Sequence, residues 1–311
     1  MMLSRVAERV YWAARYLERV ESTARLVSSY ESLLFDLHSD VKLSWYNLII
    51  ITDQQEAFNE RYNNRSERNI IKFLIGDSDN SSSLINSLQC VRENVRTTRD
   101  VVPEEAWEQI CELTIYARDN LEQGVNRRSR YGYLDDIIKG CSQINGLLLS
   151  NMPKDASWEF LSIGRNLEVA DMTARFLEAG IEAVLALEDD NAAVNSQQTI
   201  WGSVLRSLNA SQYYLRTIKA PVQGDEVMPY LLHDVVFPKS IHHCVVSAIR
   251  SSEVLPNSEV VVKKLNTLER KLLKKIDFQT TSNKLLDYVH QLQVSILGIH
   301  NVISDTWFIA D

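Results

Sequence analysis

Two segments of the chain carry the same charged residue types at the same spacing. Residues 15–25 read RYLERVESTAR, and residues 165–175 read RNLEVADMTAR. Each segment begins and ends with arginine and holds two acids between, so its carboxylates and guanidinium groups can bind each other or a charged ligand. The first quartet is Arg15, Glu18, Glu21 and Arg25, and the second quartet is Arg165, Glu168, Asp171 and Arg175.

Helical geometry places most of these charges together. Successive helix residues are about 100° apart, so Glu18, Glu21 and Arg25 form one stripe beside an apolar face. A small residue lies next to the stripe in each copy, Ala14 in the first and Gly164 in the second. Small residues let another backbone or a ligand come close.

Three interpretations of the quartets stay open. The spacing alone favours a salt-bridge network between packed helices. The second interpretation is a polar cleft between the two copies that binds a zwitterionic or anionic ligand. The third is an enzyme for amide or aminoacyl transfer, in which Glu18 or Glu168 acts as general base and the arginines hold a carboxylate or phosphate.

Two further groups of residues are weaker candidates. Arg92, Arg96 and Arg99 recur at helical spacing and are secondary anion-site candidates facing the quartets, although a solvated basic surface is the favoured interpretation. His243 and Cys244 are adjacent and point about 100° apart on a helix, so we expect no nucleophile–base pair between them.

No motif in the chain predicts a metal site or a cofactor. No glutamate is followed by a histidine three positions later, as the di-iron bundles require. The loop at residues 77–83 lacks the glycine and the final glutamate of a calcium-binding loop. The Walker A, GxGxxG, GxSxG and HExxH motifs are also missing from the sequence, which argues against the chemistry that each supports.

The composition predicts an all-α protein. The 311 residues include only 10 glycines and 6 prolines, the residues that most disfavour a helix interior. No segment shows the alternation of a strand. We therefore expect a multi-helix protein without significant β-sheet, and a length prior of about 150 residues per domain suggests two units.

The repeated quartet suggests that the two units arose by duplication. The quartets are 165 − 15 = 150 residues apart. A second, weaker match lays residues 74–88 on residues 231–245, a shift of 231 − 74 = 157 that a loop seven residues longer in the second half explains. The sequence predicts pseudo-repeated helical units at 1–150 and 151–311, free to pack as one continuous domain.

Periodicity and capping residues predict where the helices and loops lie. Helices are expected from Ser4, over 44–62, from about 84 to 100, from Pro103 to 124, over 132–150, and after a cap at Asp155 or Ser157. Loops are expected at 188–198 and at 219–229.

Charge and hydropathy restrict the surroundings of the protein. The net charge of −8 argues against nucleic acid as the main partner. Residues 263–275 predict an amphipathic helix with a solvated basic face. The amino-terminal residues hold no apolar signal-peptide core, and the apolar run at 43–51 is too short to span a membrane, so a buried helix is expected there.

Cysteine usage indicates a reducing compartment. Cys90, Cys111, Cys141 and Cys244 form no CxxC pair. We expect a cytoplasmic protein with buried, inert thiols.

The segments that carry the quartets also resemble a known family. MLSRVAERVYWAARYLERVESTARLV, at residues 2–27, closely resembles the opening of the bacterial Alpha-E domain family. This all-helical family is named for its Glu-Arg motif, here Glu18-Arg19. The resemblance continues in RENVRTTRDVVPEEAWEQICEL, GRNLEVADMTARFLE and FPKSIHHCV and covers essentially the whole chain.

The resemblance implies partners rather than a defined reaction. Family members typically accompany, or are fused to, a circularly permuted ATP-grasp ligase-like protein, and transglutaminase-like peptidases are frequent companions. This setting implies an accessory or ligand-binding component of a system that forms or modifies peptide or amide bonds. Two positions depart from the family pattern, and each would narrow a cleft: Ala14 stands where glycine is common, and Val95 where a smaller residue is usual.

Overall fold

The computed structural model describes residues 4–37, 43–187, 193–274, 276–279 and 281–308. All regular structure in these ranges is helical, so the predicted all-α class is confirmed. The elements are α1 (Ser4–Asp36), α2 (Asn47–Ile51), α3 (Gln55–Arg61), α4 (Glu67–Gly76), α5 (Leu84–Arg96), α6 (Glu104–Asp119), α7 (Leu121–Val125), α8 (Arg130–Asn151), α9 (Ala156–Leu185), α10 (Ala193–Ser207), α11 (Ser211–Thr217), α12 (Gly224–His233), α13 (Ile241–Glu253), α14 (Glu259–Leu272), α15 (Asn283–Ile303) and the π-helical turn η1 (Ser304–Phe308).

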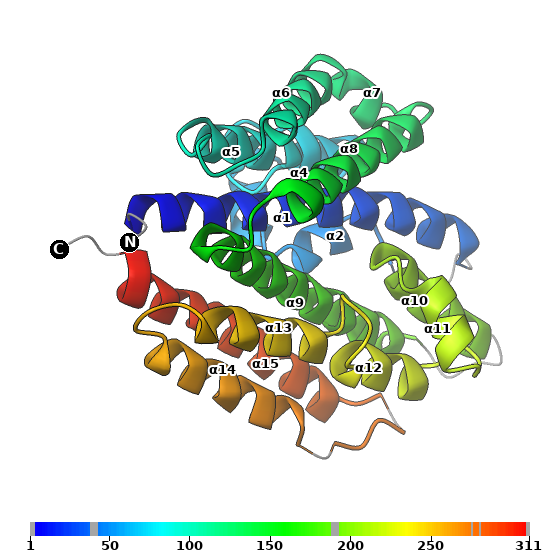
Figure 1. Ribbon diagram of the computed structural model, residues 1–311. Helices are drawn as coiled ribbons and strands as arrows, with labels where there is room; N and C mark the ends of the chain where they lie inside the picture. Colours follow the sequence, from blue (N-terminus) through cyan, green and yellow to red (C-terminus); the bar gives the residue numbers. More distant parts are fainter. Residues whose placement is uncertain (1–3, 38–42, 188–192, 275, 280, 309–311) are drawn as a thin grey trace.

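The two long helices α1 and α9 form the centre of the molecule. They pack side by side and run in the same direction (Figure 1). The apolar face predicted for the first helix is buried, as Leu17 and Val20 illustrate. The helices approach so closely at Gly164 that a Cβ atom there would lie 2.4 Å from the carbonyl oxygen of Tyr11. Glycine is therefore required at this crossing.

The remaining helices cover the central pair from opposite sides. Helices α5 and α8 pack on α1, whereas α13 and α15 pack on α9, and α10 contacts both long helices (Figure 1). Ser83 caps the amino terminus of α5, and Ser240 caps that of α13. This layout has the arrangement that a duplication would produce, and the duplication itself stays a prediction.

Several predicted boundaries differ from the structure. The helix expected at 44–62 is divided into α2 and α3 by a turn in which Asp53 has a φ of 55°. Only Leu48 and Ile49 of the apolar run at 43–51 are fully buried. The helix in this run covers only Asn47–Ile51, so the expected buried helix was wrong for the rest of the run. Asp155 caps α9, as expected, by accepting from the amides of Ser157 and Trp158.

Two segments expected to be loops are partly helical. Helix α12 begins at Gly224 and contains Pro229, although proline disfavours helix interiors. The helix persists because Val227 and Leu231 are buried, and burial outweighs propensity. Helix α10 begins at Ala193, inside the loop expected at 188–198, whose first five residues lie outside the described ranges.

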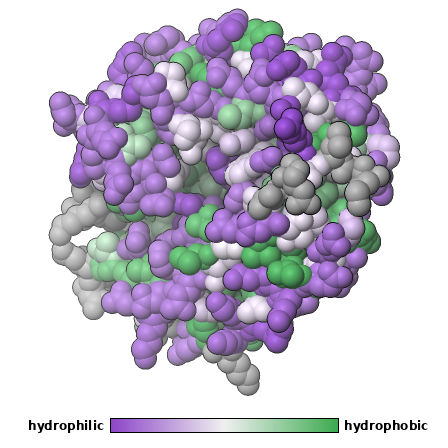
Figure 2. Space-filling view, turned by 90° about the vertical axis from the view of Figure 1, so that its left-hand side faces the viewer, coloured by the Kyte–Doolittle hydropathy of each residue, from purple (hydrophilic) through white to green (hydrophobic). Residues whose placement is uncertain are grey.

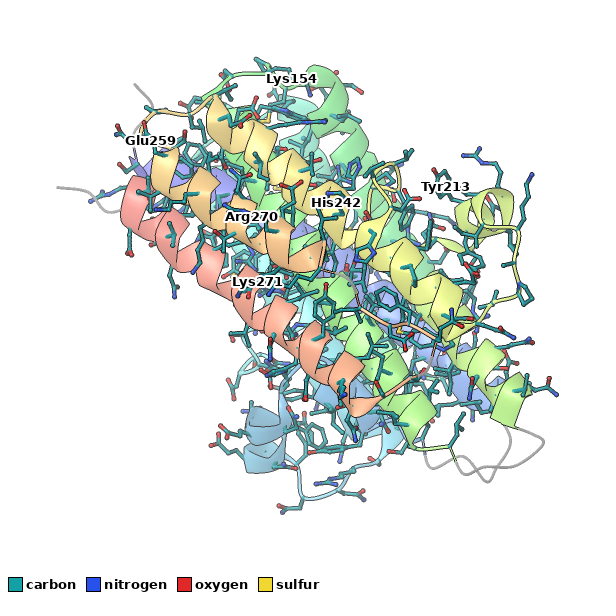
Figure 3. The ribbon with its side chains drawn as sticks, turned by 90° about the horizontal axis from the view of Figure 1, so that it is seen from below. Lys154, Tyr213, His242, Glu259, Arg270 and Lys271 are labelled. Atoms are coloured by element: carbon teal, nitrogen blue, oxygen red, sulfur yellow. The ribbon has the colours of Figure 1, made fainter. Side chains whose placement is uncertain are left out.

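The surface of the molecule is largely hydrophilic. Seen from the end at which α1 begins, hydrophobic residues form separate patches among polar ones (Figure 2). Helix α14 has the predicted amphipathic character, because Leu265 and Leu268 are buried while Arg270 and Lys271 are exposed (Figure 3). No helix of the described ranges combines the length and the apolarity that crossing a lipid bilayer requires.

The thiols follow the prediction only in part. All four cysteines are free, and Cys141 and Cys244 are buried. Cys90 and Cys111 are half-buried, so the expectation of burial was wrong for them. Neither cysteine belongs to the set of residues that its helix, α5 or α6, buries.

Candidate functional site

The two quartets face each other across the contact between α1 and α9. Arg15 Nε donates to Glu168 Oε2 at 2.7 Å, and Arg165 Nε lies 3.6 Å from Glu18 Oε2. Each arginine that opens a quartet therefore meets the first acid of the other quartet. Both acids are buried, and Arg15 is buried with them. The sequence left open whether the quartets meet, and the structure brings them together.

The second acid of each quartet pairs along its own helix. Arg25 Nε donates to Glu21 Oε1 at 2.8 Å, and Arg175 Nε donates to Asp171 Oδ2 at 2.9 Å. These are the i, i+4 pairs that the spacing predicts. Glu21 and Asp171 are buried.

The first acid of each quartet also pairs with a second cation, and this cation differs between the two quartets. Arg19 Nε donates to Glu168 Oε1 at 2.6 Å. Burial of the Glu168 carboxyl raises its pKa, but the charges of Arg15 and Arg19 outweigh burial and hold the pKa at about 2. Glu168 is therefore ionised and firmly paired.

Lys239 supplies the second cation in the other half. Its Nζ lies 3.4 Å from Glu18 Oε1 and 3.6 Å from Glu21 Oε1. Burial raises the pKa of Glu21. The charges of Lys239 and Arg25 lower this pKa by more than burial raises it, so the net pKa is below its usual value. Lys239 thus joins two carboxylates with one ammonium group.

A pocket opens beside the second quartet. We call it the polar pocket, and it measures roughly 640 Å³ when counted to its open mouth. Its walls come from α1, α9, the turn between α2 and α3, and the loop between α4 and α5. The residues used below are Arg19, Thr23, Ser82, Glu168, Asp171 and Arg175.

Asp171 is the unsatisfied group of the polar pocket. Its Oδ1 atom has no hydrogen-bond partner within the described ranges, although the side chain is only 6% exposed. Burial raises the pKa of Asp171, Arg175 lowers it in part, and the net pKa is above the usual value. A buried carboxylate oxygen without a partner costs free energy, which a ligand donor can recover.

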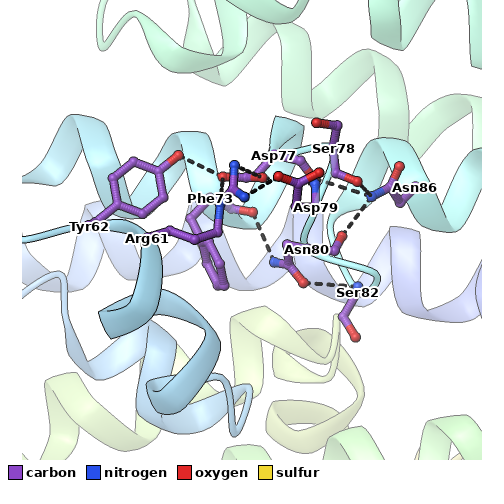
Figure 4. A network of polar contacts seen from close by, with 9 residues as sticks. All are labelled: Arg61, Tyr62, Phe73, Asp77, Ser78, Asp79, Asn80, Ser82 and Asn86. Atoms are coloured by element: carbon purple, nitrogen blue, oxygen red, sulfur yellow. Dashed lines mark hydrogen bonds and ion pairs between the residues drawn. The ribbon is translucent and has the colours of Figure 1, made fainter.

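A network of hydrogen bonds holds the loop that forms one wall of the pocket. Asn80 Nδ2 donates to Phe73 O at 3.0 Å, and the Ser82 amide donates to Asn80 Oδ1 at 2.9 Å (Figure 4). Asn86 Nδ2 donates to the carbonyls of Ser78 and Asn80 at 2.7 and 2.8 Å. These bonds fix the loop, so Ser82 meets the pocket in a defined position.

The same network ties the loop to α3. The Asp77 carboxylate accepts from the hydroxyl of Tyr62 at 2.7 Å and forms an ion pair with Arg61 at 3.0 Å (Figure 4). Arg61 also pairs with Asp79. Hydrogen bonds and ion pairs therefore hold the loop at residues 77–83 in place as one wall of the pocket.

A second cavity adjoins the polar pocket. We call it the side cavity. It measures roughly 800 Å³ with its mouth, and both cavities are lined by Asp53 and Arg175. Glu178 and Glu182 add carboxylates there, and His290 Nδ1 lies 3.1 Å from Glu178 Oε1. A ligand in the polar pocket therefore has room to extend.

The remaining candidates lie away from the polar pocket. Arg92 and Arg96 are exposed on α5 and approach Glu93, and Arg99 is exposed and lies over the ring of Trp107. The structure does not bring these three arginines to the quartets.

The adjacent histidines and cysteine bond to different groups. His242 Nε2 lies 3.3 Å from Glu269 Oε1 (Figure 3), His243 Nδ1 lies 2.9 Å from Val235 O, and Cys244 Sγ lies 3.4 Å from Pro238 O. No group of three or more His, Cys, Asp or Glu in the described ranges could hold a metal ion.

The two departures from the family pattern lie elsewhere. Ala14 and Val95 both line a small apolar cavity between α1 and α5. Neither of them lines the polar pocket. Their side chains therefore affect how α1 packs on α5.

Sequence reasoning missed three contributors to the site. Arg19 was noted only as part of the Glu-Arg motif, and Lys239 and Ser82 were not noted as site residues. The available signal was the second repeat match. Lys239 precedes the cap Ser240, Ser82 precedes the cap Ser83, and the shift is 240 − 83 = 157 in both pairs.

Comparison with known proteins identifies one family. The Alpha-E model, described as a predicted alpha-helical domain with a conserved ER motif, matches residues 2–308. Neither the curated proteins nor the solved structures include a match to this chain. In the structure, Glu18 and Arg19 belong to different charge clusters, because Glu18 meets Lys239 whereas Arg19 meets Glu168.

Proposed function

The chain belongs to the Alpha-E family, and we propose that it is a ligand-binding protein whose polar pocket receives a small charged molecule. The observation that carries this proposal is the buried Oδ1 atom of Asp171, which lacks a hydrogen-bond partner within the described ranges and belongs to a residue that lines an open pocket. Buried polar atoms are normally satisfied, so a buried carboxylate oxygen without a partner requires an explanation, and a bound ligand is one. The concave shape and the convergent polar groups are typical of a small-molecule site.

The salt bridges between the quartets serve as the frame of this pocket. Arg15 and Glu168 are buried and paired, so they hold α1 against α9 and position Arg19 at the pocket wall. The structural and ligand-binding interpretations therefore apply to different members of the same cluster. Arg15 and Glu168 support the fold, and Asp171 and Arg19 are left to meet a ligand.

The proposed setting is a system that forms or modifies peptide or amide bonds. Its support is the family resemblance, with an ATP-grasp ligase-like protein as the proposed partner and a transglutaminase-like peptidase as a further companion. The chain would act as an accessory component that binds a substrate or product of that system. Tagged protein purified from its native cell tests this setting, and failure to recover a ligase-like partner would count against it.

Catalysis by this chain has weaker support. A general base works best with a pKa near the working pH, and the pKa of Glu168 is about 2. Asp171 is the better base in the polar pocket, because its pKa is raised. No catalytic nucleophile is assigned to this pocket, so we place binding ahead of amide or aminoacyl transfer.

Thermal unfolding in the presence of small molecules tests the binding function. Alanine, dialanine, acetate and n-propylammonium would be added in turn to the wild-type protein and to Asp171→Asn. We expect at least one charged probe to raise Tm of the wild type and to lose this effect in the variant. Equal shifts in both proteins, or no shift with any probe, would contradict the assignment of the polar pocket.

A further inference from the structure

Lys239 shows how this fold binds an ammonium group. Its side chain is 15% exposed, and its Nζ atom lies between the carboxylates of Glu18 and Glu21, at 3.4 and 3.6 Å. The hydroxyl of Thr173, on α9, donates to the backbone carbonyl of Lys239 at 2.9 Å. The parts of this site are two acids on one long helix, a threonine on the other, and the residue before a helix cap.

The polar pocket contains the same parts in the other half. Glu168 and Asp171 lie on α9, Thr23 lies on α1, and Ser82 precedes the cap of α5. The threonines are 173 − 23 = 150 residues apart, the shift that separates the quartets. The two sites differ at the residue before the helix cap. The Lys239 side chain reaches the acids of its site, whereas the short side chain of Ser82 brings no ammonium group to Glu168 and Asp171.

The second acids of the two quartets, Glu21 and Asp171, differ in their ion pairs. Glu21 is paired with both Arg25 and Lys239, whereas Arg175 is the one cation paired with Asp171 among the residues that the structure describes. Arg19 supplies a charge to Glu168, but no ion pair within 4.0 Å joins it to Asp171. Burial raises the pKa of both carboxyls, yet the net pKa of Glu21 is lowered while that of Asp171 is raised.

These contacts make Asp171 a buried acceptor with fewer cationic partners than Glu21. We propose that the ligand of the polar pocket carries a primary ammonium group that binds Asp171 as Lys239 binds Glu21. This inference rests on the proposed binding function and names the chemical class of the ligand. The hydroxyl of Thr23 or Ser82 lines the same pocket and can accept the further protons of an ammonium group.

The charges of the pocket favour a ligand that also carries an anion. The pocket is lined by three carboxylates, from Asp53, Glu168 and Asp171, and by two guanidinium groups, from Arg19 and Arg175. A third guanidinium, that of Arg15, pairs with Glu168 from behind this lining, so three positive charges stand against three negative ones. A ligand with only a positive charge would leave an excess positive charge among these groups, whereas a zwitterion would leave their charges equal in number. Arg19 is 23% exposed and is the guanidinium placed to meet a ligand carboxylate.

The ligand class is therefore a free amino acid or a short peptide with a free amino terminus. The side cavity continues from the polar pocket at Asp53 and Arg175, so it offers space for a side chain or a second residue. An amino terminus fits a protein that serves amide-bond chemistry, because an amine is one of the two reacting groups in that chemistry.

A substitution tests the ammonium site without any ligand. Ser82→Lys places an ammonium at the position that Lys239 holds in the other half. We expect it to raise Tm by about 2–4 °C relative to Ser82→Met, which adds a chain of similar size without charge. The gain should vanish in an Asp171→Asn background, because the new partner is then lost. No gain over Ser82→Met, or the same gain in the Asp171→Asn background, would overturn the proposal.

Matched probes separate this inference from the proposed function. Alanine and N-acetylalanine differ in the ammonium group, and each would be added to the wild-type protein. A Tm shift with alanine alone supports the ammonium site. Equal shifts with both would leave a binding pocket and overturn the ammonium inference. If neither probe binds while Ser82→Lys is stabilised through Asp171, the ammonium site stands and the free amino acid fails as its ligand.

Discussion

Arg15 on α1 donates to Glu168 on α9 at 2.7 Å, across 153 positions of sequence. The two residues come from corresponding segments, and the reciprocal contact of Arg165 with Glu18 completes the exchange. Burial of the pair in the core makes it part of the frame of the molecule. The charges that first suggested a site are therefore also what joins its two halves.

Loss of the Glu168 charge should weaken the fold. Glu168→Gln leaves Arg15 and Arg19 without their counter-ion in a buried place, and breaking such a pair costs about 3–5 kcal/mol. Urea unfolding would measure the change. The control is Glu93→Gln, whose exposed pair with Arg96 should be worth about 1 kcal/mol or less. Similar losses of unfolding free energy in both variants would mean that the buried ion pairs of Glu168 contribute no more to stability than the exposed pair of Glu93.

The crossing of α1 and α9 should not tolerate a side chain at Gly164. Gly164→Ala places a Cβ atom 2.4 Å from the carbonyl oxygen of Tyr11, and the resulting overpacking should cost about 1–3 kcal/mol. Gly146→Ala is the matched control, because no atom lies within 4 Å of a Cβ there. That change lies inside a helix and should stabilise the protein by about 0.5–1 kcal/mol. Stabilisation by both changes would refute the close approach.

Acid should unfold the protein partly through Glu168. Its pKa is about 2 in the fold and 4.5 without the fold's influence. A carboxyl with a lowered pKa contributes stability above its unfolded pKa, and this contribution disappears as the pH falls from about 4.5 towards 2. The difference in unfolding free energy between wild type and Glu168→Gln should therefore shrink over that range. A constant difference would show that the carboxylate is not the titrating group.

Asp171 should respond to pH in the opposite direction. Its pKa is raised from 3.8, so its contribution to stability is greatest below that value and declines as the pH rises through the raised pKa. Asp171→Asn removes this decline with pH. It should cost less stability than Glu21→Gln, because the Glu21 carboxyl has a pKa that Lys239 and Arg25 lower against the effect of burial. Denaturant midpoints across the acid range would decide, and a larger loss for Asp171→Asn would contradict the contrast.

Removal of the Lys239 charge should destabilise the fold, because two buried carboxylates lose a counter-ion. Lys239→Met leaves Glu18 and Glu21 without their shared ammonium, and the expected loss is about 1–3 kcal/mol. Added n-butylammonium should restore part of the lost Tm if the emptied place accepts an amine. Lys263→Met, on the exposed face of α14, controls for the change of residue type. Equal effects of the two substitutions would speak against the internal ammonium site.

Part of the candidate site was readable in the sequence. The i, i+4 pairs Arg25–Glu21 and Arg175–Asp171 follow from helical spacing alone, because neighbouring turns of one helix bring them together. The pocket was not readable in this way. Its walls include Arg19 and Ser82, which lie on different elements far apart in sequence, and no local rule sets the distance between them.

Local signals also failed where burial competed with propensity. Pro229 and Gly224 predicted a loop, yet both belong to α12, which buries Val227 and Leu231. The predicted helix at 44–62 breaks at Asp53, whose backbone adopts a φ of 55°. These outcomes depend on contacts between elements, which periodicity in one segment does not contain.

The sequence by itself determined the helical class, the cap of α9 at Asp155, and the repetition of the charged segments, because each depends on neighbours within a few residues. Only the tertiary structure decided which charges are satisfied. Lys239 reaches Glu21, and Arg19 reaches Glu168 but not Asp171. That difference depends on how four separate segments approach one another, and it leaves Asp171, a residue that lines an open pocket, with one carboxylate oxygen that lacks a partner within the described ranges.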